Sequence, residues 1–429
     1  MLNWLIDFVL KKQLLTHRIF LLNLFLGSAV AHAAEELTLA QALALALEKN
    51  PELAAYSADL RAADGRRMQM AEMPNPEVSV EFENVAGSGD LSGIRSAETT
   101  LQLSQLIELG GKRSQRVRVA DHGRMVAGLD YDAKRLEVFR AVAQQFITVL
   151  SAQRRLQWAE DAVRLTEKFE PSARKRVEAG AASTVELTRF NLQIATAKIE
   201  RDQIQRDLAT ARKRLAALWG NNDPVFERVV GELEKLPAVP LLDESDQQLA
   251  QTPALKRWES EQTRREAAIA LERATAKPDV TVGAGYRHFN DSGESAAVFS
   301  LSVPLPLFNR NQGAVREAQA EADKAAAERH ATEVRLRADL RVAFDNLATA
   351  RTQIAAFKET ILPQAHDAFA KVNDGYQAGR FTYLEVVDAQ NTLMDAQVRY
   401  LEALTAYHLA VADIEGLTAQ PLRQTLEKE

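Results

Sequence analysis

The chain has 429 residues, of which 46% are hydrophobic, 26% charged and 6% aromatic, a composition that excludes a disordered chain. The formal net charge is −6; the first 33 residues contribute +2, which leaves −8 on the remainder. Such a modestly acidic, mixed-sign surface argues against a nucleic acid partner held by bulk charge. Cysteine is absent, which excludes disulfides, thiolate metal sites, a cysteine nucleophile and an acylated N-terminal cysteine.

The N-terminal segment has the pattern of a signal peptide. Basic residues precede a short apolar run at 19–26, and Ala31 and Ala33 have the spacing of a signal peptidase site. We expect residues 1–33 to be the signal peptide, cleaved after Ala33; an N-terminal anchor helix is the alternative. No later stretch approaches the ~20 apolar residues of a membrane-spanning helix. An exported chain without a membrane-spanning helix has three possible destinations: the periplasm, the outer membrane or the medium.

The same series of motifs occurs twice along the chain. Three segments recur in the same order with an offset of about 200 residues, as expected for an internal repeat: 50–53 recurs at 252–255, 76–80 at 278–282 and 180–187 at 379–386. The sequence therefore predicts two repeats joined by a proline-containing linker. The predicted bounds are 34–220 for the first repeat, 221–242 for the linker, 243–417 for the second repeat and 418–429 for a C-terminal tail.

Each repeat begins with a helical segment and continues with two segments of alternating polarity. Val78, Val80 and Phe82, for example, alternate with polar residues in 78–83. This period of two predicts two-faced strands. The other such segments surround Leu101 and Leu103, run from 280 to 287, and run from 299 to 303. Loops rich in Gly, Asp and Ser, at 87–93 and 290–293, predict a hairpin connection within each pair.

The rest of each repeat is predicted to be a long helical hairpin. Residues 111–179 contain no proline before Pro171, and at ~1.5 Å per residue such a helix reaches on the order of 100 Å. In the second repeat apolar residues follow a coiled-coil spacing of four and three from Leu336 to Ile361. Gly180 and Gly379 are each followed by a hydroxyl residue and a new helical pattern, so a turn is expected at both places.

Four two-faced strands cannot close a membrane barrel by themselves, and open sheet edges are not tolerated in hydrocarbon. Closure therefore requires strands from further copies of the chain, with the polar faces lining water. The edge of a soluble β-sandwich is the alternative that the strands alone leave open.

The chain resembles the TolC family of outer-membrane efflux channels over nearly all of its mature length. The resemblance rests on the duplicated layout, the strand exits at 106–113 and 304–308, and the tip motif at 376–390. Residues 73–77 and 98–113 are most similar to the heavy-metal branch typified by CzcC. The resemblance implies a mixed α and β fold in two structural repeats: a long α-helical coiled-coil barrel, and a transmembrane β-barrel with four strands per chain, completed by trimerisation.

The resemblance also implies partners and site residues. The expected partners are two further copies in a homotrimer, a periplasmic adaptor (membrane fusion) protein, an inner-membrane RND transporter and outer-membrane lipid, with the helical part in the periplasm. Five residues occupy the positions of the family's periplasmic gate: Glu385, Asp388, Tyr376, Arg380 and Glu186. Glu385 and Asp388 are expected to constrict and charge the entrance, and Tyr376, Arg380 and Glu186 to hold neighbouring hairpins closed. Gly180, Ala181, Gly379 and Arg380 are expected at the tips that dock the adaptor.

No catalytic, cofactor-binding or metal-binding motif is present. The segment 110–112 lacks the outer residues of a P-loop, and the five mature histidines are scattered singly. A conduit needs weak, exchangeable sites rather than a tight metal site. We therefore expect a non-enzymatic channel for divalent heavy-metal cations, without cofactors. The alternatives are an organic solvent or drug efflux channel of the same family, and a periplasmic coiled-coil adaptor or structural protein.

Overall fold

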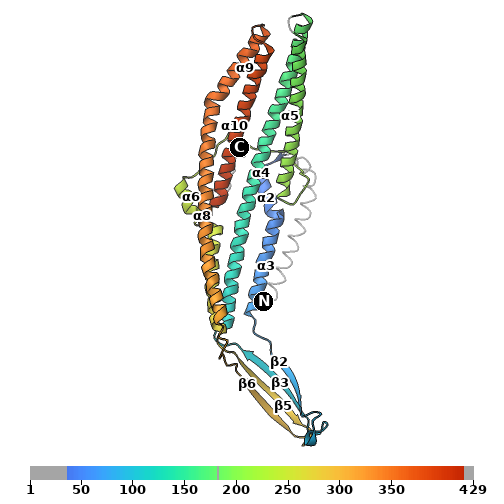
Figure 1. The fold of residues 1–429 in the computed structure, drawn as a ribbon, viewed down its shortest axis with the longest axis vertical. Helices are drawn as coiled ribbons and strands as arrows, with labels where there is room; N and C mark the ends of the chain where they lie inside the picture. The colour runs from blue at the N-terminus through green and yellow to red at the C-terminus, as the bar shows by residue number, and fades with distance from the viewer. Residues whose placement is uncertain (1–35, 181–182, 420–429) are drawn as a thin grey trace, which may run out of the picture. The chain divides into compact units, whose positions relative to one another are not determined.

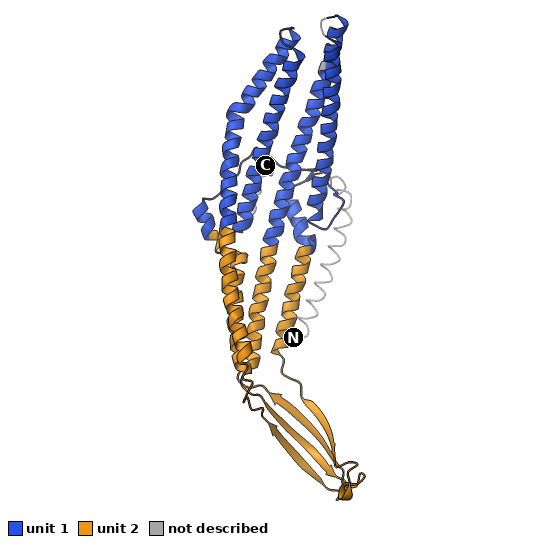
Figure 2. Cartoon of the chain, in the orientation of Figure 1, with its two compact units in different colours: residues 1–51, 135–247, 338–429 blue, residues 52–134, 248–337 orange. Residues whose placement is uncertain are grey.

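The computed structural model describes residues 36–180 and 183–419. The expected signal peptide with Ala33 and the tip residue Ala181 lie outside them. Contacts divide the chain into two compact units, and helices α4 (Lys112–Glu178) and α8 (Gln312–Ala356) contribute residues to both (Figure 2). The described part of unit 1 is 36–51, 135–180, 183–247 and 338–419, and unit 2 is 52–134 and 248–337. Each unit thus combines segments from both repeats.

Unit 2 contains one antiparallel sheet of four strands in the order β2-β3-β5-β6 (Figure 1). The strands are β2 (Glu77–Glu83), β3 (Glu98–Ile107), β5 (Val280–Phe289) and β6 (Ser295–Ser302). β3 pairs with β5, so the central pairing joins the first repeat to the second. In one row across the sheet Val80 lies opposite Leu101, Leu101 opposite Tyr286 and Tyr286 opposite Ala297. The predicted strands and their pairing within each repeat are confirmed.

The apolar face of this sheet is exposed, whereas part of its polar face is covered. On the apolar face Val80 is 54%, Phe299 82% and Leu301 71% exposed. On the polar face Thr100 is only 2% exposed, because Arg287 covers it. The Arg287 guanidinium donates to the Thr100 hydroxyl at 2.9 Å and forms ion pairs with Glu83 (2.8 Å) and Glu98 (2.9 Å). These polar side chains are therefore satisfied within the sheet, whereas its apolar side chains remain exposed among the described residues.

The helical part of unit 2 consists of α3 (Pro51–Ala71), α7 (Pro253–Thr275) and the adjoining parts of α4 and α8. A short 3-10 turn, η2 (Gly89–Leu91), lies in the loop between β2 and β3. Lys112, at the start of α4, pairs with Asp279 just before β5 at 2.7 Å. Arg257 of α7 pairs with Asp130 of α4 at 2.5 Å. Charged contacts thus join segments of the two repeats inside this unit.

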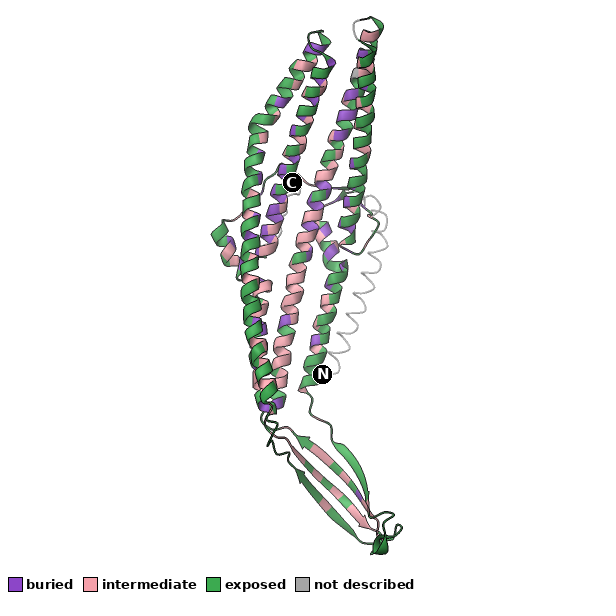
Figure 3. Cartoon of the chain, in the orientation of Figure 1, coloured by how far each residue is buried: buried purple, intermediate pink, exposed green. Residues whose placement is uncertain are grey.

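Unit 1 is built mainly from two helical hairpins, α4 with α5 (Thr184–Ala217) and α9 (Leu362–Gln377) with α10 (Tyr383–Thr418). The short helices α2 (Leu39–Lys49) and α6 (Leu242–Leu249) and the two-residue strands β1 (Glu36–Leu37) and β4 (Arg228–Val229) complete it. Buried side chains follow the inward stripes of these helices (Figure 3); Phe146, Leu215, Leu404 and Ile414 are at most 1% exposed. Among the described residues, no helix combines the length and apolar character that crossing a membrane requires.

The predicted coiled-coil seam of the second repeat is correct only in part. Leu340, Ala343 and Ile354 are buried as expected. Ile361, however, is 40% exposed, because a π-helix (η3, Phe357–Ile361) interrupts the α-helical register before α9 begins. A π turn has a wider hydrogen-bond spacing than an α turn, so it shifts the side chains that follow around the helix axis. A continuous spacing of four and three residues cannot reveal such a shift.

The linker between the repeats is bound to helices of unit 1 by hydrogen bonds to its backbone. The Gln153 side chain of α4 accepts from the Val229 N–H (2.8 Å) and donates to the Val229 carbonyl (3.0 Å). The Tyr407 hydroxyl of α10 donates to the Pro237 carbonyl at 2.7 Å. His408 Nε2 lies 2.9 Å from the Leu233 carbonyl, and burial lowers the pKa of this histidine below 6.5. The neutral imidazole is therefore the form that the folded state stabilises.

We expect the helical part to lose stability as the pH falls below about 6.5, because unfolded His408 binds a proton more readily than folded His408. Each unit of pKa difference corresponds to about 1.4 kcal/mol. The apparent melting temperature, followed by circular dichroism from pH 7.5 to 5, should fall less steeply in His408→Gln than in the wild type. His366→Gln, which changes an exposed histidine of α9, is the control. Equal slopes in His408→Gln and the wild type would contradict this prediction.

Candidate functional site

Both helical hairpins of unit 1 turn at a glycine in the left-handed region. Gly180 follows α4 with φ of +71°, and Gly379 follows α9 with φ of +73°. Only glycine adopts such φ values without steric cost, so these residues end the helices and reverse the chain. The two turns predicted from the sequence are therefore present, although Ala181 beside the first is not among the described residues.

The second turn is fixed by backbone hydrogen bonds and by one aromatic ring. The Gly379 N–H donates to the Tyr376 carbonyl at 3.0 Å, and the Arg380 N–H donates to the Gly375 carbonyl at 2.7 Å. The Phe381 ring packs so closely on Gly375 that a Cβ at this position would collide with it. The end of α9 and the start of α10 consequently hold one geometry.

A small hydrophobic cluster joins the two hairpins next to these turns. It contains Ala173 of α4, Phe190 of α5, Tyr376 of α9, and Tyr383 and Val386 of α10, so each helix contributes to it. The Phe190 and Tyr383 rings are 3.7 Å apart between centroids and are tilted by 31°. Tyr376 is only 2% exposed. Because aromatic side chains bury large areas, this cluster stabilises contact between the hairpins.

Two of the five expected gate residues meet at this cluster. The Tyr376 hydroxyl donates to Glu186 Oε1 at 3.0 Å, which links α9 to α5. Burial and this hydrogen bond raise the pKa of Tyr376 to about 12. The phenol is therefore protonated, and able to donate, throughout the physiological pH range.

Arg176 of α4 is part of the same arrangement, and the sequence analysis missed it. Its Nη1 donates to the Tyr376 carbonyl at 3.2 Å, and its guanidinium carbon lies 4.7 Å from the centroid of the Tyr376 ring. Arginine near the end of a long charged helix is an ordinary surface feature, so only the fold reveals this contact.

The two expected gate acids are exposed at the start of α10. Glu385 forms a capping box: it accepts from the Thr382 N–H at 2.7 Å and from the Thr382 hydroxyl at 2.8 Å. These hydrogen bonds lower the pKa of Glu385. Within one chain Glu385 thus acts as a helix-capping residue, whereas Asp388 projects from the first turns of the helix with its side chain exposed.

The remaining expected gate residue, Arg380, lies in the turn with its side chain exposed. Its backbone takes part in the turn, but among the described residues its guanidinium forms none of the hydrogen bonds or ion pairs found around Tyr376. The structure therefore brings Tyr376 and Glu186 together and leaves Arg380, Glu385 and Asp388 at the surface of the hairpin end.

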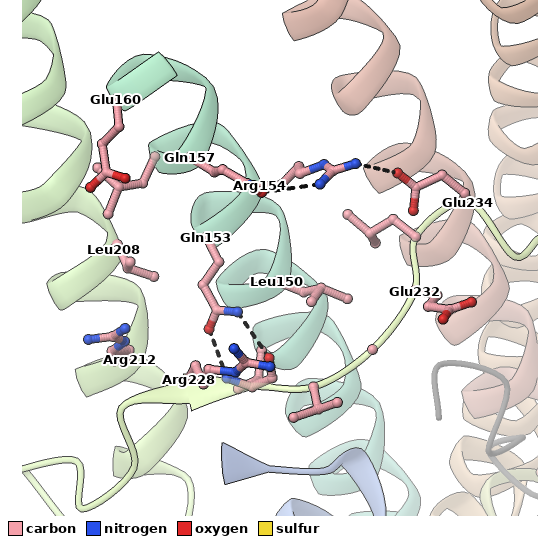
Figure 4. A pocket seen from close by; sticks show the side chains of 15 residues that line it. Leu150, Gln153, Arg154, Gln157, Glu160, Leu208, Arg212, Arg228, Glu232 and Glu234 are labelled. Carbon is pink, nitrogen blue, oxygen red and sulfur yellow. Dashed lines mark hydrogen bonds and ion pairs between the residues drawn. The ribbon is translucent and has the colours of Figure 1, made fainter. Parts of the chain in front are cut away.

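The described residues contain no group of histidine and acidic side chains suited to a metal ion. A cavity of about 650 Å³ does lie in unit 1 between α4, α5 and the linker (Figure 4). Two arginines of its lining form ion pairs: Arg154 binds Glu234, also of the lining, at 3.2 Å, and Arg228 binds Glu36 at 3.0 Å. The two Gln153 hydrogen bonds to Val229 form part of its wall. These interactions hold the linker, and we assign no ligand to the cavity.

Comparison with known proteins gives matches over most of the chain. The profile of the family described as outer membrane efflux protein matches residues 42–221 and 245–420. The cobalt-zinc-cadmium resistance protein CzcC of Cupriavidus metallidurans is 35% identical over 90% of this chain and 90% of its own length. The nickel and cobalt resistance protein CnrC of the same organism is 27% identical, over 76% of this chain and 79% of its own.

A solved structure shares the fold. A membrane protein from Pseudomonas aeruginosa superimposes with a TM-score of 0.78, covering 89% of this chain and 92% of that one, at 19% sequence identity.

Proposed function

Because the chain belongs to the TolC family of outer membrane efflux proteins, which are channels and not enzymes, we propose that it is the outer-membrane channel of a tripartite efflux system. In this proposal it conducts divalent heavy-metal cations passively from the periplasm to the exterior. An inner-membrane RND transporter supplies the driving force, and a periplasmic adaptor connects the two.

The observation that carries this proposal is the exposed apolar face of the sheet. In the part of the chain that the structure describes, side chains such as Val80, Phe299 and Leu301 are exposed, and β2 and β6 each pair on one side only. Lipid provides the missing apolar environment, and strands from two further chains provide the missing pairing. The face carrying Thr100 and Arg287 would then line a water-filled lumen.

The proposed cargo rests on the relatives. CzcC is named for cobalt, zinc and cadmium resistance and CnrC for nickel and cobalt resistance. Neither the described acids nor the histidines form a tight metal site, and a conduit works best without one, since tightly held ions leave slowly.

We further propose that the hairpin ends form the periplasmic gate and the adaptor-docking surface. The Tyr376–Glu186 hydrogen bond would hold the two hairpins of each chain together, and Arg380 would contact a neighbouring chain. Glu385 and Asp388 of three chains would surround the aperture with negative charge, which attracts cations. The turns at Gly180, Ala181, Gly379 and Arg380 would meet the adaptor.

Replacing Val80 by Arg should impair assembly in the outer membrane, because a charge on the lipid face costs about 2 to 4 kcal/mol near the bilayer midplane. Ser79→Arg, which places the same side chain on the polar face of the same strand, is the matched control. The measurement is the amount of heat-modifiable trimer in outer-membrane fractions. Equal losses in both variants would reject the lipid-facing assignment.

Deleting the gene should lower the tolerance of the host for divalent metals more than for organic toxicants. Growth would be measured across Zn, Co, Cd, Ni and several drugs, with the wild-type gene and the Val80→Arg variant supplied in trans. Restoration by the wild type alone is expected. Sensitivity confined to organic compounds would favour the solvent or drug channel instead.

Neutralising the two gate acids should reduce the preference of the channel for cations. The test compares reversal potentials of single channels under a salt gradient for the wild type and for Glu385→Gln with Asp388→Asn. The control, Asp395→Asn with Glu402→Gln, removes the same charge from exposed positions further along α10. If both double variants keep the wild-type reversal potential, these acids do not line the aperture.

A further inference from the structure

The contacts of Arg176 suggest a role in the proposed gate, and this inference rests on that proposal. Arg176 lies on α4, in the hairpin opposite Tyr376, and it contacts Tyr376 in two independent ways. One is the hydrogen bond from Nη1 to the Tyr376 carbonyl, and the other is the stacking of the guanidinium against the ring. The Tyr376–Glu186 bond involves a third part of the same residue, the hydroxyl.

The carbonyl that Arg176 binds is in the last turn of α9, which ends at Gln377. The Tyr376 carbonyl accepts both the Gly379 N–H of the turn and the Arg176 guanidinium, one hydrogen bond for each of its lone pairs. Carbonyls at this end of a helix also carry a partial negative charge together. A guanidinium placed there is stabilised by the hydrogen bond and by the helix dipole together. Arg176 therefore caps a helix of the other hairpin.

The contact between the Arg176 guanidinium and the Tyr376 ring is a second stabilising interaction at the same place. A guanidinium within about 6 Å of a tyrosine ring is attracted to its face, and the attraction grows as water is removed. Tyr376 is buried and Arg176 is half-buried, so water is removed from the ring side of this interaction.

We propose that Arg176 is a positioning residue of the gate, which holds Tyr376, and with it the end of α9, against the α4–α5 hairpin. The hydroxyl of Tyr376 is then only one of its three attachments. Tyr376→Phe removes the hydroxyl, but Arg176 still binds the backbone carbonyl and the ring at position 376. The gate should consequently open far more when both contacts are removed than when either is removed alone.

The chain offers a closely matched control two residues away. Arg174 lies on the same turn of α4, is exposed and pairs with Glu170 of its own helix. Arg174→Gln removes the same charge from the same helix without touching the second hairpin. Arg176→Lys keeps the charge and part of the ring contact but loses the planar fork of donors, so it should restore function partly.

The test uses the full-length trimer and two measurements. Single-channel conductance in planar bilayers reports the aperture, and amide hydrogen exchange of residues 370–385 reports whether the end of α9 stays attached. Arg176→Gln should raise the conductance and speed exchange roughly tenfold, the factor that corresponds to about 1.4 kcal/mol. Combining it with Tyr376→Phe should raise conductance beyond either single variant. Arg174→Gln should change neither quantity.

Two results would contradict different claims, one the role of Arg176 and the other the proposed gate. If Arg176→Gln changes neither exchange nor conductance, while Tyr376→Phe with Arg380→Ser still raises the conductance, Arg176 has no part in the gate. If exchange accelerates but no variant alters the conductance, the hairpin ends are not the gate, and the proposed gate itself is wrong.

Discussion

The sheet of unit 2 places the strictest physical constraint on this protein. Its apolar side chains are exposed, and its edge strands β2 and β6 have no second neighbour among the described residues. In water such a surface is unfavourable by about 25 cal/mol for each Å² of apolar area. Its polar face is already satisfied internally, with Arg287 joining residues of three strands. A single chain in water therefore leaves apolar side chains and strand edges of this sheet unsatisfied. An apolar environment and strands from further copies of the chain would satisfy them.

The helices of unit 1 follow the opposite rule, because they bury their apolar stripes within the chain. The hairpin ends combine both behaviours. Tyr376 of α9 is buried in a cluster with residues of α4, α5 and α10 and is bound through its hydroxyl, ring and carbonyl. The side chains of Arg380, Glu385 and Asp388, a few residues later, are exposed. A stable contact inside each chain thus lies next to exposed charges that are available to neighbours. That combination suits a constriction that must be both well ordered and responsive.

Period and spacing in the sequence were sufficient for the strands, the glycine turns and the length of the helices, since each depends on local residue pattern. Resemblance to a family, rather than period or spacing, placed Tyr376 and Glu186 at the same site, and the hydrogen bond between them appears only in the fold. Contacts between residues far apart in the chain were beyond reach. Arg176 contacts Tyr376, and Gln153 contacts the backbone of Val229, through packing that produces no periodic pattern in the sequence. The exposure of Ile361 was missed for a different reason, because a π turn does not alter the residue types on which the pattern depends.

That π turn has a structural consequence for the hairpin end. One additional residue rotates every later side chain by about 100° around a helix axis. The stretch before Phe357 and the stretch after Ile361 can therefore each carry a regular apolar repeat without sharing a common phase. The direction in which Tyr376 projects from α9 therefore depends on the π turn at 357–361 as well as on the apolar seam of α8. Shortening this segment by a single residue would leave the composition of the tip intact, yet it would turn Tyr376 away from both of its partners.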